Sequence, residues 1–326
     1  MKKLLWLLLL GPGLALAQTG GLLPRAGAAY PRPAWMQPGL LVVYTDGIGR
    51  MGSAYLVTRA TATQAYGLAF LLAQTDAGPT LSVRAGVLYD GASGPFFVQP
   101  KAAAAFVRNP PAGVQALGAP GQIGIVIQDQ DGVTKHAVRY DPASGLITEI
   151  TSTYKAPANV GPRRSAAVHQ VLAGRHRVVW PNLEGFPAAA RAAARYQILY
   201  ALSGGTSPGG SFTVTPLEVG LPLARYRIDA VTNEGPAPPS EQNGLPSLGP
   251  HYLHPALLAQ NPILAIPELG LSFHAAGEGP NGGALVVVSA NGVPFESLEV
   301  DPQSGGLIEQ RVSLAGMGMT VYRRLP

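Results

Sequence analysis

Two segments of this chain, residues 125–145 and 285–305, align without a gap and share seven identical residues. In both segments two apolar stretches flank a turn dipeptide, which is Asp131-Gly132 in the first and Asn291-Gly292 in the second. Both dipeptides tolerate the positive φ angles that a tight β-hairpin requires. The segments therefore predict an antiparallel three-stranded meander in each half of the chain. In the first half its strands are expected at residues 122–128, 134–140 and 146–154.

The replacement of Asp131 by Asn291 in the second segment keeps the turn geometry and changes the side-chain chemistry. This indicates that the shared residues serve the path of the chain and not a reaction. We therefore assign structural turn roles to Asp131, Gly132, Asp141, Gly145, Asn291, Gly292, Asp301 and Gly305.

Weaker similarities precede the matching segments in the same order, at offsets of roughly 155 to 160 residues. They relate residues 41–44 to 197–200, 52–58 to 210–215, and 95–100 to 250–255. Collinear matches of this kind favour tandem copies of one domain. We expect a first β domain at 39–155, a basic linker at 156–186 and a second β domain at 187–326.

Short strands separated by Gly and Pro turns predict a mostly β fold of two homologous antiparallel domains, as a sandwich, an open barrel or a curved sheet. Further strands are expected at residues 40–44, 54–59, 81–89 and 212–215. A few short helices are expected in the Ala-rich stretches 101–107, 165–173 and 187–195.

Residues 1–17 have the pattern of a cleavable signal peptide, with a basic start, an apolar run at 4–10 and small residues before the expected cleavage site after Ala17. The apolar run is about half of the ~20 residues that a membrane-spanning helix needs. We therefore expect an exported protein, periplasmic or extracellular or peripheral to the envelope, with no transmembrane segment after signal cleavage. Residues 18–38 contain four Pro and few apolar anchors, which favours a flexible leader.

The composition excludes several classes of protein. Of the 326 residues 47% are hydrophobic and 13% are charged, a balance unlike that of disordered chains. The chain has no Cys, which excludes disulfide frameworks, thiolate metal sites and thiol catalysis. No phosphate-binding loop, nucleophile elbow or His-Glu-x-x-His pattern is present, so we expect no cofactor and no metal site.

Positive charge gathers between the two expected domains. Residues 155–195 contain seven Lys and Arg residues against one acidic residue, Glu184. Such a cluster attracts anionic partners, and the candidate anion-binding residues are Arg163, Arg164, Arg175 and Arg177. The simpler interpretation is a solvated linker whose arginines pair with carboxylates of the two domains. Nucleic acid is not expected as the anion because the signal peptide directs the chain out of the cytoplasm.

Three short patterns suggest chemistry, and each has a structural alternative that we favour. Ser152 and Lys155 have the spacing of a serine acyl-transfer site, which needs a helix, but they end a β-like stretch. His251 and His254 are three residues apart, as metal ligands on a helix can be, but Pro250 and Pro255 bracket them. Asp129 and Asp131 resemble part of a calcium loop that lacks its distal Glu. We interpret them as hairpin residues.

These observations favour a non-catalytic exported binding or envelope protein, whose partner is an envelope lipid, a polysaccharide or another envelope protein. In this hypothesis the ligand is hydrophobic or anionic, and the apolar runs 81–89 and 284–288 line a concave sheet or else fill its core. The alternative is a secreted hydrolase acting on an envelope polymer at a site between the two copies. Its candidate residues are Asp229, Glu234, Glu241, His251 and His254, and it requires them to converge in space.

Overall fold

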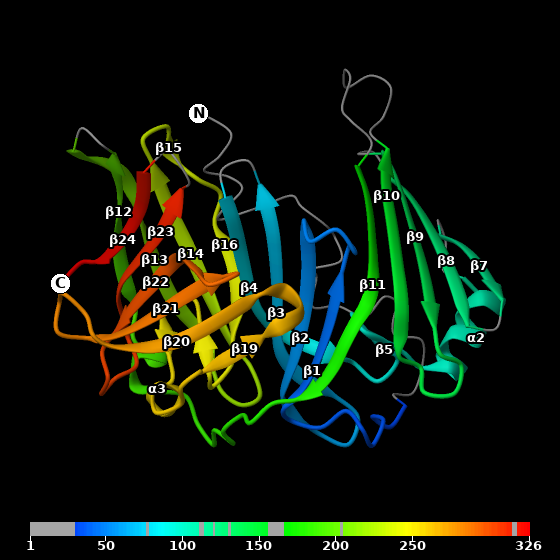
Figure 1. Ribbon diagram of the computed structural model, residues 1–326. Helices are drawn as coiled ribbons and strands as arrows, with labels where there is room; N and C mark the ends of the chain where they lie inside the picture. The colour runs from blue at the N-terminus through cyan, green and yellow to red at the C-terminus, as the bar shows by residue number, and fades with distance from the viewer. Residues whose placement is uncertain are drawn as a thin grey trace. The chain divides into compact units, whose positions relative to one another are not determined.

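The computed structural model describes residues 30–75, 78–110, 114–119, 121–129, 132–155, 166–202, 205–314 and 318–326 (Figure 1). The described chain is mostly β and its sheets are antiparallel, as the sequence predicts. It forms two compact units. The first unit holds the described residues up to Tyr66 together with Val87–Arg177, and the second holds Gly67–Gly86 together with Val178–Pro326.

The first large sheet has nine strands in the order β4-β3-β2-β1-β11-β10-β9-β8-β7. Its edge strands β4 and β7 do not pair with each other in the described residues, so the sheet is open. The strands are β1 Leu40–Thr45, β2 Met51–Ala60, β3 Ala65–Thr75, β4 Gly78–Tyr89, β7 Val114–Ala119, β8 Gln122–Asp129, β9 Gly132–Tyr140, β10 Ile147–Lys155 and β11 Ala166–Arg177.

The second large sheet has eleven strands in the order β15-β14-β13-β12-β24-β23-β22-β21-β20-β19, with β16 also paired to β14. It is open as well, because its edge strands do not pair with each other among the described residues. The strands are β12 Ala194–Leu202, β13 Gly205–Val219, β14 Ala224–Thr232, β15 Gly235–Pro236, β16 Ser240–Gly244, β19 Leu264–Ile266, β20 Leu271–Glu278, β21 Ala284–Ala290, β22 Val293–Val300, β23 Leu307–Leu314 and β24 Gly318–Arg324.

The two sheets follow the same order of strands from the centre outward. The first strand of each sheet pairs with the last, β1 with β11 and β12 with β24. In each sheet the second and third strands extend on one side and the expected meander extends on the other. In each sheet a short hairpin and a short helix connect the two sides. They are β5 Ser93–Gly94, β6 Phe97–Val98 and α2 Pro100–Arg108 in the first, and β17 Leu248–Gly249, β18 Tyr252–Leu253 and α3 Pro255–Leu258 in the second. Tandem duplication predicts this match, and the duplication itself stays a prediction.

In two of the predicted turns, the aspartate side chain forms hydrogen bonds with residues of the same turn. Asp141 accepts hydrogen bonds from the Ala143 amide and the Ser144 hydroxyl, at 3.0 and 2.6 Å. Asp301 accepts the same pair of bonds in the second sheet, from the Gln303 amide at 2.9 Å and the Ser304 hydroxyl at 2.6 Å. The hydroxyl bond is the main cause that lowers the pKa of both carboxyls. These side chains hold turns, which accounts for their repetition.

Gly145 and Gly305 close these turns with φ angles of 74° and 77°. A Cβ on Gly145 would lie 2.4 Å from the Val98 carbonyl oxygen, and one on Gly305 would lie 2.6 Å from that of Leu253. Only glycine satisfies both the positive φ and the close approach of the connecting hairpin. At the other predicted turn, Asn291 and Gly292 both have positive φ, at 51° and 79°, as a two-residue hairpin of the primed type requires.

Of the three expected helices, one forms as predicted. In α2 the Gln99 side chain accepts from the Lys101 amide, Pro100 starts the helix, and Ala103 and Phe106 are buried. At 187–195 only a single 3-10 turn forms, η2 Ala188–Arg191. A second 3-10 turn is η3 Pro267–Leu269.

The expected helix at 165–173 is wrong, and the same residues correct the extent of the linker. Residues 166–177 form β11, which pairs with β1 on one side and with β10 on the other. A strand with two partners satisfies backbone groups that a surface linker would leave to water, and this outweighs the helix propensity of its alanines. The first sheet therefore extends to Arg177, beyond the expected domain end at residue 155.

Part of the expected flexible leader is packed. Met36 is fully buried, and the Trp35 ring contacts Phe97 edge-on with centroids 5.7 Å apart. The Arg177 guanidinium donates to the carbonyls of Trp35 and Pro38, both at 3.0 Å. Apolar burial and these two hydrogen bonds hold residues 35–38 against the first unit despite their proline content.

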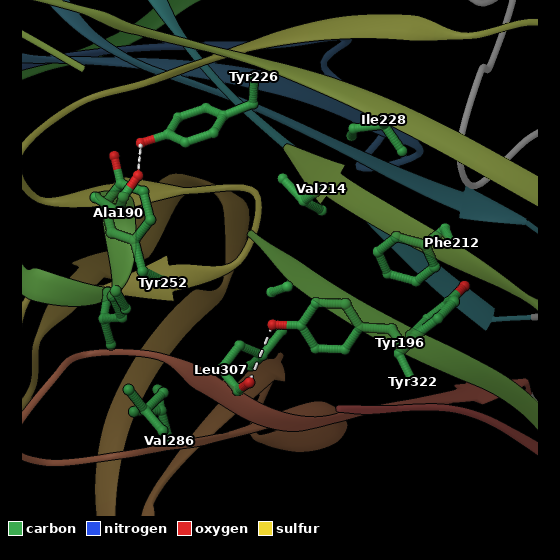
Figure 2. Packing of buried hydrophobic residues seen from close by; sticks show 14 of the residues in the cluster. Ala190, Tyr196, Phe212, Val214, Tyr226, Ile228, Tyr252, Val286, Leu307 and Tyr322 are labelled. Carbon is green, nitrogen blue, oxygen red and sulfur yellow. Dashed lines mark hydrogen bonds between the residues drawn. The ribbon is translucent and has the colours of Figure 1, made fainter. Parts of the chain in front are cut away.

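The core of the second unit lies on one face of its sheet, which we call the inner face. It carries stacked Tyr196 and Phe212, 5.0 Å between ring centroids, with Val214, Tyr226 and Tyr322 (Figure 2). Two buried hydroxyls reach backbone carbonyls, Tyr196 to Leu307 at 3.0 Å and Tyr226 to Ala190 at 3.1 Å (Figure 2). Val286 and Val288 of β21 are 1% exposed, so the apolar run 284–288 contributes to this filled core.

The inner face of the first sheet has the same kind of anchor. The Tyr44 ring is fully buried, contacts Tyr55 edge-on, and donates its hydroxyl proton to the Ile147 carbonyl at 2.8 Å. Cross-strand pairing places Ile150 and Val138 on this face, and both are buried. In both units a tyrosine from the first strand thus ties it to the backbone near the start of the next-to-last strand.

Candidate functional site

Polar side chains interrupt the apolar inner face of the first sheet. The His136 Nδ1 atom and the Ser152 hydroxyl lie 2.9 Å apart on the paired strands β9 and β10. On β2 and β11, the Ser53 hydroxyl lies 3.3 Å from Oε1 of Gln170. Ser53, Ser152 and Gln170 are 4%, 7% and 5% exposed. Polar groups buried to this degree are costly unless they are paired, so their presence on a core face marks this face as more than packing.

Histidine 136 is neutral near physiological pH because burial lowers its pKa. A neutral imidazole has one donor and one acceptor nitrogen. Ser152 contacts Nδ1, and within the described residues no hydrogen bond reaches Nε2. The inner face therefore presents a free imidazole nitrogen beside a buried hydroxyl.

This pair is not arranged as a catalytic serine site. Ser152 lies within the strand β10 and not at the start of a helix, which a serine acyl-transfer site of this spacing requires. No carboxylate in the described part of the chain contacts His136, so a third group that would orient the imidazole is missing. The pair suits hydrogen bonding to a ligand better than nucleophilic attack.

The inner face of the second sheet carries a carboxyl group at the matching position. Glu296 aligns with His136 in the repeated segments, and its Oε1 atom accepts from the Gln310 amide at 2.6 Å. Register places Glu296 opposite Val288 and Val312, two core residues. Burial raises the pKa of Glu296 to about 7. The group therefore changes its charge in the physiological range, which is unusual for a carboxyl and common at functional sites.

The surroundings of Glu296 are aromatic and apolar. Gln310 lies opposite Tyr322 on β24 and opposite Leu298 on β22. The pKa of Tyr322 is raised first by burial and then by the charges of Tyr200 and Glu296, which places Tyr322 within electrostatic reach of each of these two groups. Glu296, Leu298, Tyr200 and Gln310 are only partly buried. This part of the inner face is thus less completely covered than the core around Tyr196.

Two other buried carboxylates of the second sheet are fully occupied by the protein. Glu299 accepts from the Asn281 amide and side chain, both at 2.7 Å, and from the Gly283 amide at 3.0 Å. Glu309 forms ion pairs with Arg311 and Arg323, at 2.5 and 2.6 Å. These groups stabilise the fold and leave no free oxygen for a ligand. Glu296 differs from both because only Oε1 has a partner among the described residues.

Of the candidate anion-binding arginines, Arg175 and Arg177 belong to the described residues, and anion binding by them stays a prediction. Arg163 and Arg164 lie outside the described residues. The Arg175 guanidinium lies over the Trp35 ring, 5.5 Å from its centroid, and Arg177 holds two carbonyls of the leader. These two arginines fasten residues 35–38 to the sheet, in a role that sequence reasoning missed.

The candidate hydrolase residues do not converge. Asp229 pairs with Arg227 at 2.8 Å and Glu241 pairs with Arg225 at 3.0 Å, with all four side chains substantially exposed. Glu234 is exposed, and the His254 side chain accepts from the Ala256 amide at the start of α3. The imidazole of His251 is buried and its Nε2 atom lies 2.9 Å from the Ala189 carbonyl. The arrangement needed for the hydrolase hypothesis is absent from these residues.

His251 is a structural residue. Its Nε2 atom faces two carbonyl oxygens, of Ala189 and Ala192, so Nε2 carries the proton and donates it. Burial lowers the pKa, which keeps the ring neutral. Its ring packs edge-on against Tyr226 and Tyr252, with centroids 5.1 and 5.4 Å apart. His251 therefore joins η2 to the core, and it is not a metal ligand paired with His254.

Within the described residues there is no group of three or more His, Asp or Glu side chains that could hold a metal ion. Asp129 lies in β8 and pairs across the hairpin with Gly132, and Asp131 lies outside the described residues. No described helix is both long and apolar enough to cross a membrane.

A surface pocket of about 560 Å³ lies in the second unit, apart from the inner-face polar groups. Arg195 and Arg324 line it together with apolar side chains, and none of the polar residues around Glu296 does. It is lined by Ala193, Ala194, Arg195, Thr213, Ile308, Arg324, Leu325 and Pro326.

No family model matches the chain, and no curated protein matches it. Among solved structures, the chain is similar to a protein of unknown function from the DUF3598 family of Nostoc punctiforme, at 8% sequence identity. The match covers 89% of this chain and 97% of that one, with a TM-score of 0.17.

Proposed function

We propose that this protein is an exported, non-catalytic binding protein of the cell envelope that holds an apolar ligand on the inner faces of its sheets. The single observation that carries the proposal is the occurrence of a polar group at matching positions on both inner faces, His136 and Glu296. Each is hydrogen-bonded on one side only, within a face that is mostly apolar.

Structural needs alone do not account for these groups. A core that only had to be filled would gain stability from apolar residues at both positions, since burying a polar group costs free energy that a single hydrogen bond offsets only in part. A binding face, in contrast, combines mostly apolar contact area with a few polar groups that orient the ligand. The two groups differ in chemistry, so the two sheets are expected to differ in the ligand, or in the part of the ligand, that they accept.

Export rests on the signal peptide predicted at residues 1–17. An exported protein whose inner faces are mostly apolar and carry a few polar groups fits a carrier or receptor for envelope lipid better than the hydrolase alternative. Within the described residues, both arginines offered for anion binding are engaged with Trp35 and the leader, so the apolar ligand is the stronger expectation.

Native mass spectrometry of the mature protein, purified from the envelope fraction of its own cells, tests the proposal. The expected result is a reproducible added mass that solvent extraction releases as lipid. The variants His136→Phe and Glu296→Leu, which remove the polar group at each matching position, should reduce the amount of ligand recovered. A bare protein mass in gentle conditions, repeated with added envelope lipid extract, would contradict the proposal.

A further inference from the structure

The carboxyl group of Glu296 has no positive partner in the described part of the second unit. Its one hydrogen bond is the 2.6 Å contact from the Gln310 amide to Oε1, and no described Lys, Arg or His forms an ion pair with it. The two buried carboxylates of this sheet, Glu299 and Glu309, have partners on both oxygens. An unpaired carboxylate on an apolar face is costly, and a ligand that brings a positive charge would remove the cost.

The surroundings of Glu296 also suit a cation. Tyr322 lies within electrostatic reach of the carboxyl group, and phenol rings attract ammonium groups through their electron-rich faces. Leu298, two residues further along β22 and partly exposed, supplies apolar contact. Gln310 fixes the carboxyl through Oε1 and leaves Oε2 without a described partner. A protonated amine can donate to that oxygen while its hydrocarbon part contacts the apolar side chains.

Resting on the proposed function, we infer that the inner face of the second sheet selects an apolar molecule that carries a protonated amine, with Glu296 as its counter-ion. An apolar carboxylate would place a like charge beside Glu296 and would be rejected. An apolar alcohol could bond to Oε2 but would leave the charge of Glu296 without compensation. The chemistry of the site therefore orders the three head groups as amine, alcohol and carboxylate.

Isothermal titration of the mature chain at pH 8 with octylamine, octanol and octanoate tests this order, because the three probes share one hydrocarbon chain. Octylamine should bind at least tenfold more tightly than octanol, and octanoate more weakly than both. Glu296→Gln, which keeps the shape of the side chain, should reduce the affinity for octylamine to that for octanol. The matched control Glu218→Gln makes the same chemical change on an exposed residue of β13 and should leave all three affinities unchanged.

A pH comparison adds a readout that a merely structural role of Glu296 would not move. With a pKa of about 7, Glu296 is mostly ionised at pH 8 and mostly protonated at pH 6, so the affinity for octylamine should fall by up to about tenfold across this range. The other titratable groups facing it, the phenols of Tyr200 and Tyr322, stay protonated because burial raises both pKa values. The Glu296→Gln variant should lose this dependence.

The outcomes separate the two proposals. Equal affinity for octylamine and octanol, or an unchanged octylamine affinity in a folded Glu296→Gln protein, would overturn the amine selectivity and leave the apolar binding face standing. No binding of any of the three probes would overturn both. Circular dichroism of each variant shows that the comparison is made between folded proteins.

Discussion

Replacing Tyr196 by Phe removes one oxygen atom from the centre of the second unit. The side chain is fully buried and its hydroxyl donates to the Leu307 carbonyl at 3.0 Å. The ring keeps its packing against Phe212, so the change leaves the apolar contacts intact. What is lost is one buried hydrogen bond that connects β12 to β23, two strands separated by β24.

The cost follows from the environment of the bond. A buried hydrogen bond contributes about 1 kcal/mol, and a carbonyl left without its partner adds a desolvation penalty, so the free energy of unfolding should fall by about 1.5 kcal/mol. For a unit of this size the melting temperature should then fall by about 3–6 °C. Differential scanning calorimetry of the mature protein measures the shift.

The control for this variant is Tyr140→Phe. Tyr140 is 9% exposed in β9, and no described hydrogen bond involves its hydroxyl. The melting temperature of the Tyr140→Phe protein should therefore differ from that of the wild type by less than about 1 °C. Equal melting temperatures for Tyr196→Phe and the wild type would refute the reasoning, because the buried hydroxyl would then contribute nothing to holding β12 near β23.

Three other measurements follow from the fold. Gly305→Ala should lower the free energy of unfolding by about 3 kcal/mol in urea titrations, since the new Cβ meets a backbone oxygen at 2.6 Å at positive φ. Gly292→Ala, with φ of 79° but nothing within 4 Å of the new Cβ, should lower it by only about 1 kcal/mol, and equal losses for the two variants would contradict the close approach at Gly305. For Glu296 the folded pKa of about 7 lies above the ordinary value of 4.5 for a glutamate, so the free energy of unfolding should fall by about 2–3 kcal/mol as the pH rises from about 4.5 to 7. Glu296→Gln should abolish this part of the pH dependence, and parallel pH profiles of variant and wild type would contradict it. A fragment of residues 30–177 should unfold cooperatively by calorimetry and one of residues 30–155 should not, since only the longer fragment contains β11, which pairs with both β1 and β10. A cooperative transition in the shorter fragment would contradict the central role of β11 in the first sheet.

The sequence was most informative where the chain makes tight turns. Asn291-Gly292 and the Asp-x-x-Ser-Gly turns at 141–145 and 301–305 specify their backbone through positive φ and local hydrogen bonds. These are short-range effects, so they can be predicted without knowing what packs nearby. The meander strands and the α2 helix follow for the same reason, because local periodicity and a capping residue determine them.

The sequence was least informative where the partner of a residue is distant in the chain. The alanines of 165–173 favour a helix locally, and only pairing with β1, more than a hundred residues earlier, makes this segment a strand. The same holds for Arg177, whose guanidinium finds carbonyls at residues 35 and 38. Tertiary pairing outweighs local propensity at such positions.

The candidate site shows the same division. The sequence placed Glu296 and His136 in matching strands but gave no reason to single them out, because a polar residue in an alternating strand is expected to face water. It pointed instead to Asp229 and Glu241, which pair with Arg227 and Arg225, and to Arg175 and Arg177, which contact the leader. The sequence by itself determined the turns, the meanders and the β class of the fold, since these depend on neighbouring residues. Only the tertiary structure decided which polar side chains lie on the inner faces, because burial and the lack of a partner are properties of the assembled sheet and not of any segment within it.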